Sequence, residues 1–422
     1  MKKLVYAFAL IGVLALMAVQ ALAVSLQSFD SVVEGKNDPS SDVKAVQEAV
    51  SKGGTVLLKG TFDFGKKGRV NITKDITILG EADKDGNPLT KIHGGFWTFF
   101  SPLPSKGSPP KAPGPKVAIR GIHFDGAIWT PLHFPYTSGA EISHNTITNV
   151  LPFQVPHKWK GGETLLLHAG AVFGTRFVHQ EKILPTATGK LIFANNRVDL
   201  KNQNPTMIMG QGAFFIWTWG ADILVRENHI TNVTRNSIET IDNYVDEKGR
   251  GTVNIENNKI VTPTEGIEFP SPVTPNGIVA GCFLDMSAGT NPRRYSKIHI
   301  LGNYIEVRGK TGVGIGVLSD KVVVGFNEIV VGGGPKASGI GIMGSDGLIA
   351  KNTFKGSGAF AMGTRKWGPL TGCRNSFVWN DISKFKGSVA HVAFTSNDNF
   401  VLGSSCKIVD QGQNNRKLIG GK

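Results

Sequence analysis

The fold is decided between residues 300 and 354, where ILGNYIEV (300–307), VGFNEIVV (324–331) and IAKNTF (349–354) follow one another. Each unit places β-branched residues on both sides of one Asn. Units of about 25 residues, each too short to bury an apolar face alone, are typical of repeat architectures in which neighbouring units stack. The sequence therefore predicts a solenoid of short strands.

The same pattern extends in both directions from this stretch. Most intervals between successive Asn are 24 to 32 residues, but one is 51 and another is 45, which fits either two coils or one coil with a long insertion. A second strand pattern, such as GVGIGVLSD (312–320), recurs upstream of most units. The repeated residues are Asn145, Asn196, Asn228, Asn258, Asn303, Asn327, Asn352 and Asn380.

A stack of coils, each with about three short strands, explains these intervals. Every strand would pair with its copy one coil away, at about 4.8 Å. We expect each Asn to occupy a bend, where its backbone tolerates a left-handed conformation and its amide bonds to the next Asn in a ladder. An antiparallel sandwich or a propeller is the alternative, but propeller blades need a steady period of about 40–50 residues.

A single short helix is predicted before the strands. In DVKAVQEAVS (42–51), Val43, Val46, Ala49 and Val50 share one face, Ser40 or Ser41 can cap the start, and Gly53 and Gly54 stop the helix. GGTVLLKG (53–60) follows as a strand. We expect a helix that caps the N-terminal end of the solenoid.

This helix, the GGTVLLKG strand and the repeated Ile-x-x-Asn-x-Ile units resemble the right-handed parallel β-helix superfamily typified by pectate lyases, over about residues 40–410. The resemblance implies an all-β, single-stranded right-handed parallel β-helix. That superfamily contains lyases, hydrolases, epimerases, esterases, tailspikes and adhesins, so the fold does not decide the reaction. The short motifs of polygalacturonases and the Asp-Pro-His of alginate epimerases are absent from the sequence.

The N-terminus has the pattern of a signal peptide. Lys2 and Lys3 precede an uncharged apolar run, residues 4–19, and Ala21-Leu22-Ala23 offers small residues for cleavage. A membrane anchor is the alternative, since the run is near spanning length. We expect a secreted or periplasmic protein without integral membrane association, divided into residues 1–23 (signal peptide), 24–54 (segment with the capping helix), 55–410 (β-helix) and 411–422 (tail).

Charge and cysteine content restrict the partners. The chain carries a net charge of +14, and without Lys2 and Lys3 the remaining 44 basic and 32 acidic residues leave +12. Such a chain attracts polyanions. No basic helix or nucleic-acid module is evident, so we expect an acidic polysaccharide or glycan as partner, and a monomer. Cys282, Cys373 and Cys406 are too few for a disulfide scaffold or a multi-Cys zinc module, and we expect free buried thiols.

Candidate site residues lie on the first strand of each coil. Alternation with Ile238 directs Glu239 outward, and Asp242 and Asp285 would follow it at the end of the same strand and in the next coil. Such carboxylates form an acid/base pair or bind a hard cation. The catalytic candidates are Glu239, Asp242, Asp285, Arg235 and His168, and the saccharide-binding candidates are Trp217, Trp219, Arg365 and Lys366.

Two functional classes stay open. One is an enzyme: uronate elimination needs a base and positive charge, for which the resembling family often adds a Ca²⁺ held by acids, whereas hydrolysis needs two carboxylates at a defined separation. No His spacing typical of a metal site is present, and no metal ligand is assigned. The other class is a non-catalytic β-helix that binds glycans or forms part of the envelope. In that case the acids are solvated or pair with Arg235, and the Trp side chains cover a loop.

Overall fold

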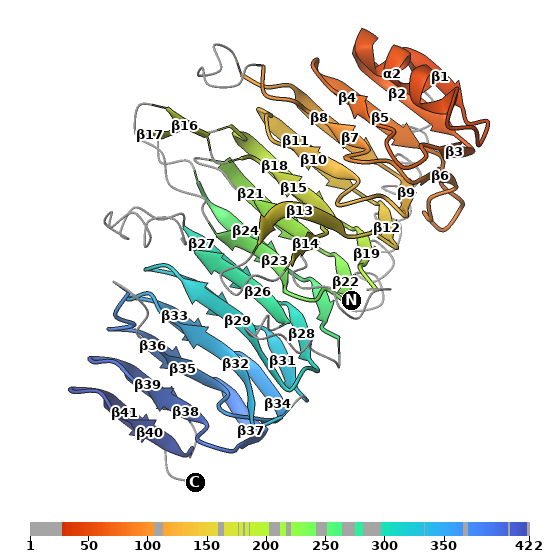
Figure 1. The fold of residues 1–422 in the computed structure, drawn as a ribbon. Helices are drawn as coiled ribbons and strands as arrows, with labels where there is room; N and C mark the ends of the chain where they lie inside the picture. The colour runs from red at the N-terminus through yellow and green to blue at the C-terminus, as the bar shows by residue number, and fades with distance from the viewer. Residues whose placement is uncertain are drawn as a thin grey trace, which may run out of the picture.

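A computed structural model of the chain describes residues 28–419. The ranges left undescribed within it are 105–112, 159–163, 176, 180–181, 185, 202–211, 217–220, 242–250, 264–274, 282–296, 333, 366–369 and 404–405. The chain winds repeatedly through three parallel sheets, so that each sheet receives one strand from each coil. This is a right-handed parallel β-helix, and Figure 1 shows its coils stacked from the red N-terminal end to the blue C-terminal end.

The 12-stranded sheet contains the strands that the sequence pattern placed upstream of the Asn units. Its members are β4 (Val70–Asn71), β7 (Phe99–Phe100), β10 (Leu132–Phe134), β15 (Ala171–Phe173), β20 (Phe214–Ile216), β23 (Asn236–Ile241), β26 (Asn276–Gly281), β29 (Thr311–Leu318), β32 (Lys336–Ile342), β35 (Met362–Thr364), β38 (Val392–Phe394) and β40 (Ile408–Asp410).

The 14-stranded sheet is the next that the chain enters in each coil. Its members are β1 (Ser31–Glu34), β2 (Gly54–Lys59), β5 (Ile76–Gly80), β8 (Lys116–Arg120), β11 (Gly139–Ser143), β18 (Gly189–Ala194), β21 (Ala221–Arg226), β24 (Val253–Glu256), β27 (Ile298–Leu301), β30 (Val323–Gly325), β33 (Leu348–Ala350), β36 (Ser376–Val378), β39 (Phe400–Gly403) and β41 (Arg416–Ile419).

The 11-stranded sheet completes the coil. Its members are β3 (Thr61–Asp63), β6 (Thr90–His93), β9 (Ile122–Asp125), β12 (Thr146–Thr148), β19 (Arg197–Asp199), β22 (His229–Thr231), β25 (Lys259–Val261), β28 (Tyr304–Val307), β31 (Glu328–Val331), β34 (Thr353–Gly358) and β37 (Asp381–Gly387). Two antiparallel pairs stand apart from the three sheets: β13 (Phe153–Lys158) with β14 (Thr164–Leu167), and β16 (Phe177–His179) with β17 (Lys182–Leu184).

One continuous apolar core fills the space between the sheets. Because side chains alternate between the two faces of a strand, each strand sends every second residue inward. Phe rings occupy the core of the early coils, and Ile and Val occupy most of the middle coils. The coils therefore depend on one another for burial, as expected of a solenoid.

The helix α2 (Asp42–Lys52) closes the N-terminal end, as predicted. Val46, Ala49 and Val50 are buried in the core, and Gly53 ends the helix at φ 82°. Ser41 stands at the start but its side chain makes no capping bond. Instead the buried Asp42 carboxylate accepts backbone N–H bonds from Lys36, Asp38 and Asp63, which ties the helix to β3. Within the described residues no helix has the length and apolar character needed to span a bilayer.

The predicted Asn ladder is confirmed. The first seven side-chain amides each donate to the Oδ1 of the next Asn at 2.8–3.2 Å. All eight also donate to a backbone carbonyl. All eight members are buried. The ladder runs through Asn145, Asn196, Asn228, Asn258, Asn303, Asn327, Asn352 and Asn380.

The expected left-handed backbone lies one residue earlier than predicted. The residues directly before the ladder Asn have positive φ values of 51–58°, among them His144, Glu227, Phe326 and Trp379, with Gly302 at 66°. The bend of the backbone thus precedes the Asn. The Asn itself follows the bend, and its side chain is buried.

The long intervals are now resolved as single coils with insertions. Asn145 bonds directly to Asn196 and Asn258 directly to Asn303. The parallel sheet also extends beyond the boundaries drawn from the sequence, since β1 pairs with β2 and β41 pairs with β39. A second, shorter ladder of Asn375, Asn399 and Asn415, linked through backbone N–H groups, supports the C-terminal coils.

Candidate functional site: the outer face of the 12-stranded sheet

One column of residues defines the outer face of the 12-stranded sheet. The core residues of this sheet include Phe99, Leu132 and Ile238, so the residue after each faces outward. Strand register links these outward residues from coil to coil, with β20 between Val172 and Glu239: Phe100, His133, Val172, Glu239, Val279, Gly316, Gly341, Gly363 and Ala393.

Glu239 belongs to this outward column, as predicted, but it is not exposed. Its side chain is 1% exposed and forms an ion pair with Arg235, with 3.2 Å between Nη1 and Oε2. Burial raises the pKa of the Glu239 carboxyl, and the Arg235 charge and a hydrogen bond from Asn236 oppose that shift. The interpretation that Glu239 lines an open groove is therefore corrected: the residue faces outward from the sheet but is buried, which alternation alone does not reveal.

A chain of amides holds the Glu239 carboxylate. Asn236 Nδ2 donates to Glu239 Oε2 at 2.6 Å, and Asn276 Nδ2 donates to Asn236 Oδ1 at 2.8 Å. The Val313 N–H in turn donates to Asn276 Oδ1 at 2.9 Å. Three successive strands, β23, β26 and β29, thus fix one buried carboxylate, and the alternative that this acid pairs with Arg235 is confirmed.

Apart from Arg235, no predicted site residue joins Glu239 in the described part of the chain. His168 is fully buried. Burial lowers the pKa of His168 to about 4, so this residue is a neutral interior group at physiological pH. Arg365 is exposed after β35, four strands from β23 and hence roughly 19 Å along the sheet. Asp242, Asp285, Trp217, Trp219 and Lys366 lie outside the described residues.

The described residues contain no group of three or more His, Cys, Asp or Glu that could hold a metal ion. Binding of a hard cation such as Ca²⁺ by Glu239, Asp242 and Asp285 stays a prediction, because Asp242 and Asp285 lie outside the described residues. Cys373 and Cys406 are both unpaired. They are half-buried rather than fully buried, and Cys282 lies outside the described residues.

An aromatic cluster that sequence reasoning missed occupies the N-terminal end of this face. Trp97 stacks on Phe100 with ring centroids 4.9 Å apart, and Trp129 stacks on Phe153 at 5.4 Å. The two indoles lie 5.1 Å from each other, and Phe96 contacts both. We call Phe96, Trp97, Phe100, Trp129, His133 and Phe153 the aromatic cluster; all six are partly exposed.

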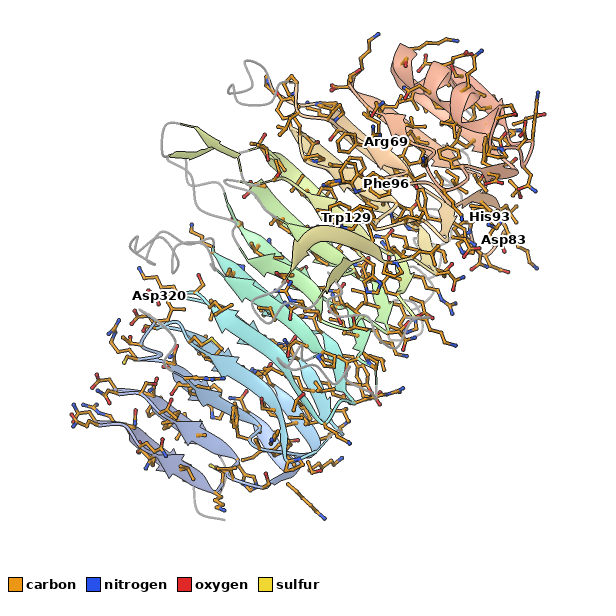
Figure 2. All side chains as sticks on the ribbon, in the orientation of Figure 1. Arg69, Asp83, His93, Phe96, Trp129 and Asp320 are labelled. Carbon is orange, nitrogen blue, oxygen red and sulfur yellow. The ribbon has the colours of Figure 1, made fainter. Side chains whose placement is uncertain are left out.

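A repeated dipeptide could have revealed this cluster. Trp97-Thr98 and Trp129-Thr130 each precede a strand of the 12-stranded sheet, and the parallel bridge Phe96–Ile128 shows that they occupy equivalent places in adjacent coils. Figure 2 shows Phe96 and Trp129 over the N-terminal coils, far from Asp320 in the C-terminal half. Successive coils thus bring two tryptophans together.

A shallow cleft of about 620 Å³ marks a different surface, the outer face of the 14-stranded sheet. Lys116 and Lys190 line it together with Asp75 and Glu141, so the two signs of charge balance. The aromatic cluster combines ring surface with partial exposure and is the stronger candidate for ligand binding.

No protein-family model and no curated protein matches the chain. Solved structures with a similar course include the Streptococcus pneumoniae surface protein and adhesin PfbA, with 11% identity and a TM-score of 0.44 over 89% of this chain and 96% of that one. The Azotobacter vinelandii mannuronan C-5 epimerase AlgE6 A-module has 11% identity and a TM-score of 0.39, over 92% and 96%. The alginate lyase AlyF-OU02 in complex with G6 has 10% identity and a TM-score of 0.40, over 93% and 86%. These likenesses concern the fold alone.

Proposed function

We propose that the protein is an exported β-helix protein that binds an acidic polysaccharide along the outer face of the 12-stranded sheet. The observation that carries this proposal is the partly exposed aromatic cluster at the N-terminal end of that face. Aromatic rings offer large, rigid contact area at low entropic cost, and their faces pack against the apolar faces of sugar rings.

The charge of the chain supports an acidic ligand. An excess of 12 positive charges outside residues 1–23 raises the local concentration of polyanions. A solenoid presents the same backbone spacing at every coil, which suits a long, repetitive ligand. Binding along the stack therefore explains both the composition and the placement of the cluster.

Cleavage of the polysaccharide is the second candidate function, and Glu239 is the observation that favours it. A buried carboxyl with a raised pKa is suited to donate a proton. The ion pair with Arg235 and the hydrogen bond from Asn236 instead favour a structural role for the Glu239 carboxylate. Turnover would appear as absorbance near 235 nm for elimination or as reducing ends for hydrolysis, and Glu239→Gln should abolish either signal without loss of fold.

Replacing Trp129 by Ala should weaken retention on an acidic polysaccharide about tenfold or more, in line with the ~1–3 kcal/mol of other aromatic stacking platforms. Affinity electrophoresis against a panel of uronate and sulfated polymers would measure it. Trp379→Ala is the control, because Trp379 is also a Trp at positive φ, is exposed, and lies at a different corner in a distant coil. Equal retention of both variants would contradict the placement of the binding face.

Export predicts loss of residues 1–23. The N-terminal sequence of protein recovered from the medium or the periplasm should begin at Val24. A chain that retains Met1 and fractionates with membranes would instead support the anchor interpretation.

A further inference from the structure

Arg69 lies beside the aromatic cluster with its charge available. It directly precedes β4, and its side chain is exposed. The guanidinium carbon is 5.0 Å from the ring centroid of Phe100 and 5.7 Å from that of Trp97. Both distances fall within the range of cation–π attraction, so the two stacked rings hold the guanidinium in place.

This guanidinium differs from those arginines of the solenoid that a carboxylate engages. Arg120, Arg235, Arg308 and Arg374 each form an ion pair with a carboxylate at 2.6–3.2 Å. Arg69 has no ion pair and no side-chain hydrogen bond among the described residues, and its guanidinium lies over the two rings. Its donors are therefore free to bind a carboxylate or a sulfate in the bidentate geometry that guanidinium favours.

The two tryptophans have a backbone conformation that is unfavourable for bulky residues. Trp97 has a φ of 53° and Trp129 a φ of 68°, and a bulky residue in this region is uncommon. Strain of this kind persists where the surrounding structure fixes it, and it gathers at ligand sites. Hydrogen bonds from Thr98 Oγ1 to the Gly94 carbonyl and from Thr130 Oγ1 to the Gly170 carbonyl lock the two turns.

Two polar atoms of the cluster are buried beside each other. Trp97 Nε1 and His133 Nδ1 have no hydrogen-bond partner among the described residues, and the two rings are 4.5 Å apart. Burial, with a contribution from Arg69, lowers the pKa of His133 to about 3, which leaves Arg69 as the permanent charge of the cluster.

We propose that Arg69, with the rings of Trp97 and Phe100, forms the subsite that recognises the anionic group of a sugar residue, a carboxylate or a sulfate. This inference rests on the proposed function and names the group that gives it selectivity. The rings supply contact with the sugar, and Arg69 supplies the charge that distinguishes an acidic sugar from a neutral one. A polyanion without sugar rings would meet the charge but lose the ring contact.

The test uses the full chain and four probes: a uronate polymer, the same polymer with its carboxyls reduced, a sulfated neutral polysaccharide and inorganic polyphosphate. Arg69→Gln should weaken binding to the uronate or the sulfated polymer about tenfold, the size expected for one charge-assisted hydrogen bond pair, and should leave the reduced polymer unaffected. A loss with one polymer alone identifies carboxylate or sulfate as the recognised group. Polyphosphate should bind more weakly than the polymer so identified.

Arg416→Gln is the matched control, because Arg416 is exposed, has no ion pair among the described residues and lies at the far end of the stack. Thermal unfolding of each variant verifies the fold. If the wild-type chain retains no acidic polymer, the proposed function fails. If it does and the two Arg variants behave alike, the proposed function stands and the subsite is wrong. Equal loss on the reduced polymer would also overturn it, because Arg69 would then position rings rather than recognise charge.

Discussion

Replacing Asn258 by Ala is expected to lower the free energy of unfolding by about 3 kcal/mol or more, because one exchange leaves several buried polar groups without partners at ~1–3 kcal/mol each. Asn258 Nδ2 donates to Asn303 Oδ1 at 2.9 Å and to the Val225 carbonyl at 2.9 Å. Its Oδ1 accepts from the Asn228 backbone at 3.1 Å and from Asn228 Nδ2 at 2.8 Å. Alanine can replace none of these bonds.

The defect should be local as well as large. Because coils contact only their neighbours, stability in a solenoid is close to a sum of coil and interface contributions. Urea unfolding followed by circular dichroism would give the loss, and hydrogen exchange should rise first in the strands next to Asn258. Asn254→Ala is the matched control: Asn254 lies in the same coil, in β24, but is half-buried and bonds only to His299 among the described residues. Equal losses in the two variants would contradict the ladder as a principal source of stability.

Much of this architecture can be predicted from the sequence, because the ladder needs an Asn at the same place in successive coils. An amide offers a donor and an acceptor along the same direction, so Asn stacks on Asn where Asp or Ser would leave a gap. The helix over residues 42–51 can be predicted for a similar reason, since its apolar face and the glycines that end it are close together in the chain. Each signal depends on residues that are close in the chain.

The candidate site is harder to predict from the sequence, because it depends on contacts between segments that are far apart in the chain. Alternation gives the direction of Glu239 correctly, yet burial depends on side chains contributed by other segments. The aromatic cluster unites residues between Phe96 and Phe153 that meet through coil register, and register is fixed by the stack as a whole. The repeated Trp-Thr dipeptide is the sequence signal for this cluster. It indicates that two tryptophans meet only when Phe96 and Ile128 are known to pair.

The second large effect is expected at the buried ion pair. Arg235→Met should destabilise the fold at neutral pH by about 3 kcal/mol, the lower end of the ~3–5 kcal/mol for a buried charge that loses its partner. The lower end applies because Arg235 is itself 28% exposed, while Glu239 is 1% exposed. Among the described residues, the Glu239 carboxylate would then keep only the Asn236 bond. Thermal and urea unfolding at pH 7 would measure the change.

Low pH should remove the destabilisation caused by Arg235→Met, and the direction of this pH dependence follows from the raised pKa of Glu239. A carboxyl whose folded pKa lies above its ordinary value of 4.5 binds its proton more tightly in the folded state, so its contribution to stability is full below 4.5 and is lost as pH rises through the folded pKa. In Arg235→Met the folded pKa rises further, so the deficit relative to the wild type should be largest at neutral pH and vanish below about pH 4.5, where both folded states carry a neutral carboxyl. Glu239→Gln should be at least as stable as the wild type at pH 7, and adding it to Arg235→Met should restore most of the loss. A deficit of the same size at pH 4 and pH 7 would mean that Arg235 acts through packing, because only a penalty carried by the Glu239 charge can be titrated away.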